Sequence, residues 1–142
     1  MNKILLTLAF IIALGGLSQA QDSDTPGPAI KFNKKVHDYG TIEHQSDGSC
    51  TFEFTNTGDQ PLALTTVRSS CGCTVPKWPR KPVMPGDKGK IKVTYDTRRL
   101  GPINKQVTVR SNAKNGTIVL KIKGKVVKEQ PNIIQKNKSD IE

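Results

Sequence analysis

Residues 117–127 read TIVLKIKGKVV, and alternate positions along most of this stretch are apolar and charged. The apolar series is Ile118, Leu120 and Ile122, continued by Gly124. Lys121, Lys123 and Lys125 occupy the positions between them. Because successive side chains of a β-strand point to opposite faces of its sheet, this period of two predicts a strand with one buried and one solvated face. We therefore expect the three lysines to share an exposed face.

The same period recurs upstream, where residues 49–55 (SCTFEFT) place Cys50, Phe52 and Phe54 on one face. Further short β-rich runs are separated by Gly, Pro, Asn and Asp, and none keeps a helical period for three turns. These runs cover residues 30–33, 36–39, 62–69, 90–96 and 104–110. The pattern predicts an all-β fold, an immunoglobulin-like β-sandwich of about seven strands, over residues 30–127.

The connections between the runs give further expectations. The first two runs are expected to form one interrupted opening edge that ends at Gly40, a residue free to adopt unusual backbone angles. The turn sequence NTGD at residues 56–59 predicts that the strands on either side of it are antiparallel neighbours. Four prolines in residues 76–85 predict that this segment crosses from one sheet to the other. Within PGD at residues 85–87, we expect a turn with positive φ at Gly86.

Both ends of the chain read differently from the sandwich. Residues 1–20 carry an early lysine, a 14-residue apolar run at 4–17 and Ser-Gln-Ala at 18–20, which are the parts of a cleavable signal peptide. That run is shorter than the roughly 20 residues of a spanning helix, so no transmembrane anchor is expected after cleavage. Residues 21–29 predict a flexible leader and residues 128–142 a mobile tail. The expected location is the periplasm or the extracellular space.

The formal net charge is +10, and basic residues are concentrated late in the chain. Nine lysines and arginines, and no acid, lie between Asp96 and Glu129. They are Arg98, Arg99, Lys105, Arg110, Lys114, Lys121, Lys123, Lys125 and Lys128. Such a field attracts anionic partners, although solvent-facing lysines also serve solubility and protect sheet edges. An envelope protein or an anionic envelope polymer is the expected partner. Nucleic acid is not, because no recognition helix or stacking ladder is visible.

Three cysteines in an exported chain leave at least one unpaired within a monomer. Cys50 shares a face with two phenylalanines and is expected to be a small buried hydrophobe out of disulfide reach of Cys71. Cys71 and Cys73, on either side of one glycine, leave three interpretations open: packing of a tight loop, a strained and labile disulfide, or two ligands of a soft metal such as Cu(I) or Zn(II). A complete metal site would need further ligands, and His37 or His44 would have to supply them.

No catalytic constellation is visible, because no nucleophile sits in a strand-turn-helix elbow and no paired carboxylates flank a cleft. His37 is expected to be an ordinary strand residue. Trp78, the only tryptophan, lies between prolines near Lys77 and Arg80. It is expected to cover one end of the core, with ligand contact by an exposed ring face as the alternative.

An ordered series of motifs over residues 30–127 resembles the exported bacterial proteins of domain-of-unknown-function family 1573. The motifs are HDYGTI at 37–42, FEFTNTG at 52–58, PL at 61–62, SCGCT at 70–74, PG at 85–86, Gly101, and SN at 111–112. That family is similar to the immunoglobulin-like domains related to the major sperm protein and the pilus chaperones. The resemblance implies a seven-stranded sandwich in the cell envelope or outside the cell, without enzymatic activity. Cys50 departs from the aromatic or aliphatic residue expected there.

The sequence thus favours a non-catalytic binding or scaffolding module with no cofactor. Its expected contact residues are Trp78, Lys121, Lys123 and Lys125. The alternative is a metal-handling or thiol-redox protein centred on Cys71 and Cys73.

Overall fold

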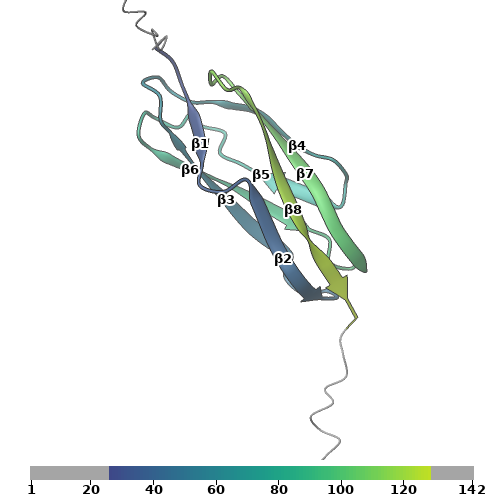
Figure 1. Cartoon of the computed structure of the whole chain (residues 1–142). Helices are drawn as coiled ribbons and strands as arrows, with labels where there is room; N and C mark the ends of the chain where they lie inside the picture. Colours follow the sequence, from purple (N-terminus) through teal and green to yellow (C-terminus); the bar gives the residue numbers. More distant parts are fainter. Residues whose placement is uncertain (1–25, 129–142) are drawn as a thin grey trace, which may run out of the picture.

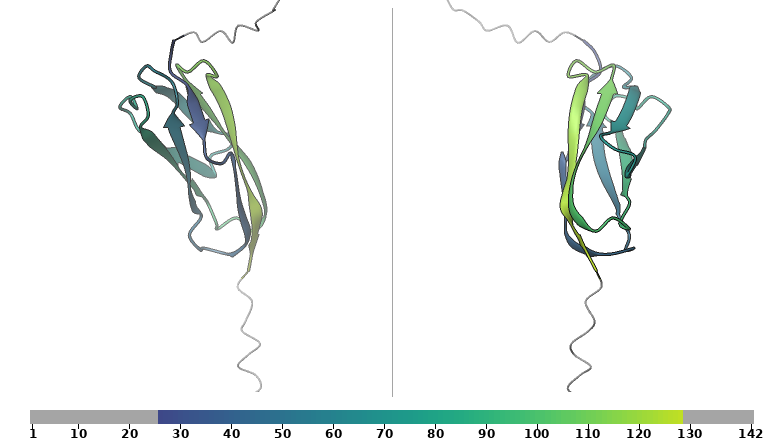
Figure 2. Two further views of the ribbon diagram at one scale, coloured as in Figure 1. Left: turned by 60° about the vertical axis from the view of Figure 1, so that its left-hand side comes forward. Right: turned by 90° about the vertical axis from the view of Figure 1, so that its right-hand side faces the viewer.

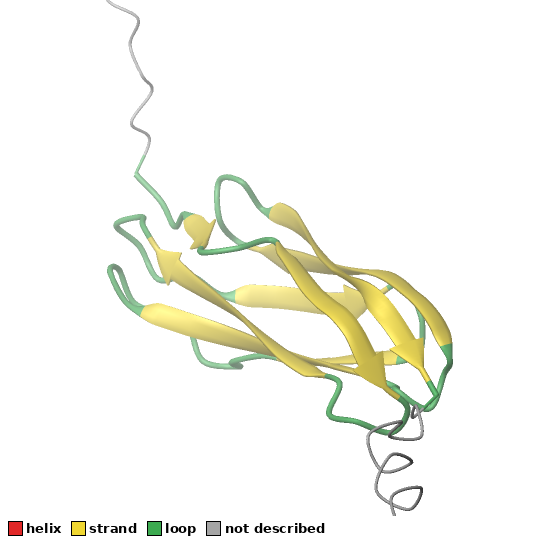
Figure 3. Cartoon of the chain, turned by 60° about the horizontal axis from the view of Figure 1, so that its bottom comes forward, coloured by secondary structure: helices red, strands yellow, loops and turns green. Residues whose placement is uncertain are grey.

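The structure is a computed structural model that describes residues 26–128. These residues form two facing four-stranded β-sheets, and no helix occurs among them (Figures 1 and 3). The strands are β1 (Ile30–Phe32), β2 (Val36–Glu43), β3 (Ser49–Asn56), β4 (Leu64–Ser69), β5 (Thr74–Lys77), β6 (Lys88–Tyr95), β7 (Gly101–Ser111) and β8 (Thr117–Val127). The predicted all-β sandwich is confirmed.

One sheet, which we call sheet A, has the strand order β1-β3-β6-β5, and the other, sheet B, has the order β2-β8-β7-β4. All neighbours are antiparallel except β2 and β8, which are parallel. Figure 2 shows the two layers from the side, with β7 and β8 running along most of the length of sheet B.

The core lies between the sheets and follows the alternation predicted from the sequence. In β3 the side chains of Cys50, Phe52 and Phe54 are buried, and in β8 the buried series ends at Val126. The largest fully buried side chains are Phe52, Phe54, Leu62, Ile91, Leu120 and Ile122. Burial of each such side chain contributes about 1.5–3 kcal/mol to folding, so this layer supplies most of the driving force.

The prediction that residues 30–39 form one opening edge was wrong. Residues 30–43 form two strands in different sheets: β1 pairs with β3, and β2 pairs with β8. With β5, a strand that the sequence analysis did not predict, the sandwich has eight strands among the described residues, against the expected number of about seven. Strand β2 also continues past Gly40, where φ is +61° and the pairing register with β8 shifts. Gly40 thus forms a bulge inside the strand rather than its end.

The predicted hairpin between β3 and β4 is also wrong, because β3 belongs to sheet A and β4 to sheet B. Residues 56–63 carry the chain across the sandwich. Asn56 is fully buried at the start of this crossing, so its side chain is part of the protein interior and not an exposed turn residue.

The proline-rich segment does not cross between sheets. Strands β5 and β6 are neighbours in sheet A, so residues 78–87 connect two strands of one sheet. Pro76 lies within β5, which is tolerated because β5 is an edge strand. The chain crosses between the sheets just before this segment, from β4 to β5, at residues 70–73. The turn prediction at residues 85–87 is confirmed, since Gly86 has φ +81° and the Asp87 amide donates to the Met84 carbonyl at 3.0 Å.

The predicted signal peptide (1–20) lies outside the described residues, as do most of the leader (21–29) and all of the tail (128–142) except Lys128. No helix long and apolar enough to span a membrane occurs in residues 26–128.

Candidate functional site

The first candidate site is the loop at residues 70–73, which connects β4 of sheet B to β5 of sheet A. In this loop a disulfide joins Cys71 and Cys73, whose Cα atoms are 5.3 Å apart. Cys73 is buried against the core, while Gly72 between the two cysteines is exposed. The Ser69 hydroxyl lies 2.6 Å from the carbonyl oxygens of both Cys71 and Thr74 and can donate to either. The Ser69 hydroxyl therefore anchors the start of the loop by hydrogen bonding, whereas Gly72 in its middle is exposed to solvent.

The structure has Cys71 and Cys73 joined in a disulfide, which is compatible both with the interpretation that the pair holds a tight loop and with that of a labile disulfide. A disulfide sulfur is not a thiolate ligand, so metal binding would require the reduced protein. Neither histidine completes a site: His37 packs edge-on against Tyr39, and the His44 ring lies 3.1 Å from the Arg98 carbonyl oxygen. Among residues 26–128 no group of three or more His, Cys, Asp or Glu side chains is arranged to hold a metal.

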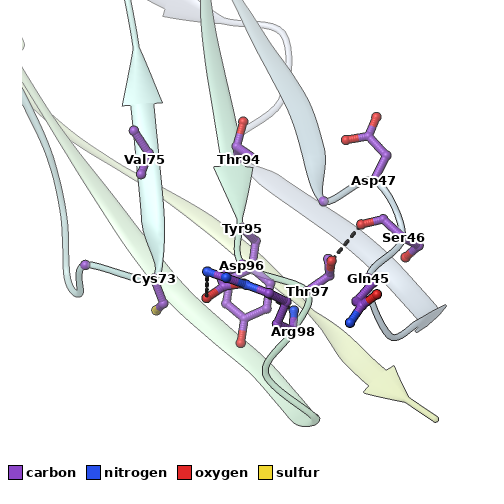
Figure 4. A pocket seen from close by; sticks show the side chains of 12 residues that line it. Gln45, Ser46, Asp47, Cys73, Val75, Thr94, Tyr95, Asp96, Thr97 and Arg98 are labelled. Carbon is purple, nitrogen blue, oxygen red and sulfur yellow. Dashed lines mark hydrogen bonds and ion pairs between the residues drawn. The ribbon is translucent and has the colours of Figure 1, made fainter.

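A cleft of about 610 Å³ adjoins the disulfide (Figure 4). It lies between the β2–β3 loop, the first residues of β5, and the end of β6 with the loop that follows. Its lining residues are Gln45, Ser46, Asp47, Gly48, Gly72, Cys73, Val75, Thr94, Tyr95, Asp96, Thr97 and Arg98. Sequence reasoning did not find this cleft, because its parts come from three segments far apart in the chain.

The polar groups of the cleft are largely committed to one another. Asp96 receives a hydrogen bond from Arg98 Nε at 2.8 Å, and Thr97 donates to the Ser46 carbonyl at 2.6 Å. The hydrogen bond from Arg98 lowers the pKa of Asp96, and hydrogen bonds from Ser49 lower the pKa of Asp47. Both carboxyl groups are therefore ionised at neutral pH and are poor proton donors or acceptors there. The cleft offers no matched acid and base.

Cys50 is the one free cysteine of the chain, and it is 6% exposed. Its expected role as a small buried hydrophobe is confirmed. Burial raises the pKa of the Cys50 thiol. This cysteine is therefore protonated and poorly reactive at neutral pH.

The second candidate site is the outer face of sheet B, on which Lys121, Lys123 and Lys125 are all exposed. Cross-strand register places Gln106 beside Lys121 and Asn104 beside Lys123. The Lys123 ammonium pairs with Asp38 on β2 at 3.1 Å, and this is the one ion pair made by the three lysines within the described residues.

Two arginines extend this face, and sequence reasoning did not find them together. Arg68 on β4 and Arg110 on β7 line a hollow of about 360 Å³ with Thr66 and Thr108. The register pairs Thr66 with Arg110 and Arg68 with Thr108. Since β4 and β7 are more than 30 residues apart in the chain, their register could not be read from the sequence. We call the five cations of this surface the sheet B face: Arg68, Arg110, Lys121, Lys123 and Lys125.

Sheet A also carries lysines on its outer face, which the sequence analysis missed. Lys88, Lys90 and Lys92 alternate along β6 in the same way as the lysines of β8. Lys90 pairs with Glu53 at 3.1 Å. A hollow on this side is lined by Asn33, Lys34, Thr51 and Glu53 and so contains an acid. Lysine alternation alone therefore does not distinguish the two faces.

Trp78, the remaining predicted contact residue, packs against the core. The guanidinium carbon of Arg80 lies 3.9 Å from the centre of its ring. The ring is thus partly buried against the core, with the Arg80 cation over one of its faces. The structure does not bring Trp78 together with the sheet B face.

The two facing sheets with their mixed strand order define an immunoglobulin-like β-sandwich. Residues 30–126 match the model of the family described as "Protein of unknown function (DUF1573)", and the chain belongs to that family. The resemblance found in the sequence is confirmed. No curated protein matches the chain.

Solved structures with a similar fold share little sequence with this chain. The ASH/PapD-like domain 7 of human CEP192 has a TM-score of 0.65 at 11% identity, covering 84% of this chain and 99% of that domain. A protein of unknown function from Porphyromonas gingivalis W83 has a TM-score of 0.63 at 15% identity, covering 76% of this chain. This chain spans 51% of the Porphyromonas protein, about half its length. The secreted serine protease VesC from Vibrio cholerae has a TM-score of 0.55 at 12% identity, covering 72% of this chain and 24% of the protease. At these identities the likeness concerns the fold.

Proposed function

We propose that this protein is an exported, non-catalytic binding module of the cell envelope that binds an anionic envelope polymer through the sheet B face. The observation that carries the proposal is an excess of unneutralised positive charge on this surface. Among the described residues, its five cations make one ion pair, between Lys123 and Asp38.

The cations of the sheet B face form a path that suits a polymer. Lys121, Lys123 and Lys125 follow one another on the same side of β8, about 7 Å apart along an extended strand. Arg110 and Arg68 continue the path across β7 and onto β4. A chain with repeating negative groups could contact several of these cations at once, and the contacts would add through effective concentration.

The absence of a matched acid and base in the cleft supports a binding role over a catalytic one. Export is supported by the signal-like residues 1–20. The disulfide between Cys71 and Cys73 supports it independently, because disulfides persist in oxidising compartments such as the periplasm.

Reversal of Lys121, Lys123 and Lys125 to glutamate is expected to lower retention on isolated cell envelopes by about tenfold at low salt, since it converts attraction into repulsion. Cosedimentation of the purified exported protein with washed envelopes measures this. The matched control is reversal of Lys88, Lys90 and Lys92, which removes the same charge from alternate positions of β6 on sheet A. Equal losses in the two variants, or no loss in the first, would refute the assignment of binding to the sheet B face.

A second candidate function, thiol redox at Cys71 and Cys73, is favoured by the position of their disulfide beside the cleft. A disulfide closed over one intervening residue forms a small ring, and strained rings are readily reduced. Cys71 is partly exposed whereas Cys73 is buried, so Cys71 is the cysteine that a thiol would attack.

Alkylation before and after mild reduction tests this candidate. We expect no alkylated cysteine in the untreated native protein, alkylation at Cys71 after reduction of the native protein, and three alkylated cysteines after reduction in denaturant, because Cys50 and Cys73, both 6% exposed, become accessible only on unfolding. Intact mass should rise by about 2 Da when the disulfide opens. A disulfide that resists mild reduction in the native protein would argue against a redox role and leave a structural one.

A further inference from the structure

We propose that Thr66, Arg68, Thr108 and Arg110 form a subsite for a phosphate group carried by the bound polymer. This inference rests on the proposed function and deepens it by naming the chemical group recognised. The four side chains line the hollow of about 360 Å³ on the outer face of sheet B.

The pairing of β4 with β7 fixes the arrangement of the four residues. Thr66 lies directly opposite Arg110, and Arg68 lies directly opposite Thr108. Side chains directly opposite on neighbouring strands have Cβ atoms about 5 Å apart, and diagonal neighbours are about 7–8 Å apart. The two arginines therefore stand on one diagonal of a small quadrilateral and the two threonines on the other. All four side chains can reach its centre.

The charges of Arg68 and Arg110 lack protein partners within the described residues. The cations that do pair with a carboxylate within 4 Å among the described residues are Lys90, Arg98, Arg99 and Lys123. The two guanidinium groups stand on one diagonal of the quadrilateral, and their like charges repel each other at a cost in free energy. An anion bound between the guanidinium groups would remove that penalty.

Protection of a sheet edge does not account for both arginines. A charge on the edge strand β4 blocks pairing with another molecule, which could explain Arg68. Arg110, however, lies on β7, which is paired on both sides by β4 and β8. A cation there contributes nothing to edge protection, so the concentration of donors in the hollow calls for another reason.

The donor set suits a phosphate group better than a carboxylate. Each guanidinium presents a planar fork of N–H donors that binds phosphate or carboxylate oxygens in pairs, and each threonine adds a hydroxyl donor. A carboxylate has two oxygens to share among these donors, whereas a phosphate monoester has three outward-facing oxygens. The partly exposed hydroxyls of Thr66 and Thr108 complete a site with donors on four sides.

Titration of the purified exported protein with glucose 6-phosphate and, separately, with glucuronate tests the subsite by amide NMR shifts. Sodium chloride at equal ionic strength corrects for general screening. We expect saturable shifts at residues 66–68 and 108–110 with the sugar phosphate, and binding at least about tenfold weaker with the carboxylate, the equivalent of one charge-assisted hydrogen bond. Equal affinity for the two sugars, or shifts spread over both sheet faces without saturation, would overturn the phosphate assignment.

Two double variants complete the test. Arg68→Gln with Arg110→Gln should weaken sugar phosphate binding by about tenfold or more, while Lys88→Gln with Lys92→Gln, which removes equal charge from sheet A, should leave it unchanged. Thr66→Val with Thr108→Val keeps side-chain shape and should produce a smaller loss, a few-fold, if the hydroxyls donate. Unchanged affinity in the arginine variant overturns the subsite.

The subsite and the proposed function can fail separately. If lysine reversal on β8 abolishes envelope retention but sugar phosphate does not bind, the binding face stands and the phosphate subsite is wrong. If sugar phosphate binds saturably in the hollow but retention is unaffected by lysine reversal, the subsite stands and the proposed role of the face as a polymer-binding surface is wrong.

Discussion

Replacement of Asn56 by alanine is expected to lower the free energy of unfolding by about 4 kcal/mol, because it removes four hydrogen bonds, one of them buried and three partly buried. The Asn56 side chain is 0% exposed. Its amide nitrogen donates to the Gln60 carbonyl at 2.8 Å and to the Val83 carbonyl at 3.0 Å. Its side-chain oxygen accepts from the amides of Gly58 and Ala29 at 3.0 and 3.4 Å.

These bonds tie together three separate segments at one end of the sandwich. The backbone of Asn56 contributes further, since its amide donates to the Asp87 carbonyl and its carbonyl accepts from Gly86. An alanine at this position would leave the Gln60 carbonyl and the amides of Gly58 and Ala29 without these partners, whereas the Val83 carbonyl would keep its hydrogen bond from the Leu62 amide. Each unsatisfied buried group costs about 1–3 kcal/mol. Asn56 thus holds the leader, the crossing after β3 and the turn before β6 in one arrangement.

Urea unfolding followed by the fluorescence of Trp78, the only tryptophan, measures the effect. The matched control is Asn33→Ala, the same substitution at an exposed asparagine, for which we expect a change within about 0.5 kcal/mol. A loss below about 1 kcal/mol for Asn56→Ala would show that water replaces the lost bonds and that the end of the sandwich is not closed.

The faces of individual strands were predictable from the sequence, because alternation is a local property. Cys50, Phe52 and Phe54 point inward as expected, and the lysines of β8 point outward. The pairing of strands was not predictable in the same way. A hairpin was expected at residues 56–59 because consecutive strands often pair. Instead, hydrogen bonds from the Asn56 side chain to Ala29 and Val83 hold the segment that crosses to the other sheet after β3. Both partners are distant in the sequence, so the residues NTGD do not reveal them.

The candidate sites show the same limit. The cysteine pair could be found from spacing alone, but the cleft beside it needs the β2–β3 loop and the end of β6. The lysines of β8 were visible as a pattern, whereas Arg68 and Arg110 meet only through the register of β4 and β7. A binding surface on a sheet is formed by side chains of neighbouring strands, whose positions depend on the strand register. The periodicity of one sequence shows only which residues of a single strand share a face, so it could not predict these surfaces.

Gly89→Ala is expected to lower the free energy of unfolding by about 3 kcal/mol, the upper end of the usual cost of overpacking a core. Gly89 is buried on β6, directly opposite Phe54 of β3. A Cβ atom at Gly89 would stand 2.7 Å from Cε1 of the Phe54 ring, inside van der Waals contact. The ring has little room to withdraw, since Phe54 is 0% exposed and its centroid lies 5.5 Å from that of Phe32.

Gly72→Ala is the matched control, because a Cβ at Gly72 would meet no atom within 4 Å, and its cost should stay within about 0.5 kcal/mol. The decisive comparison is a double-mutant cycle with Phe54→Leu, a smaller side chain that leaves space above Gly89. Alone, Phe54→Leu should cost about 1.5 kcal/mol by leaving a cavity. In that background Gly89→Ala should cost less than about 1 kcal/mol, a coupling of about 2 kcal/mol between the two residues. Additive losses would mean that the penalty at Gly89 comes from the strand backbone and not from the Phe54 ring.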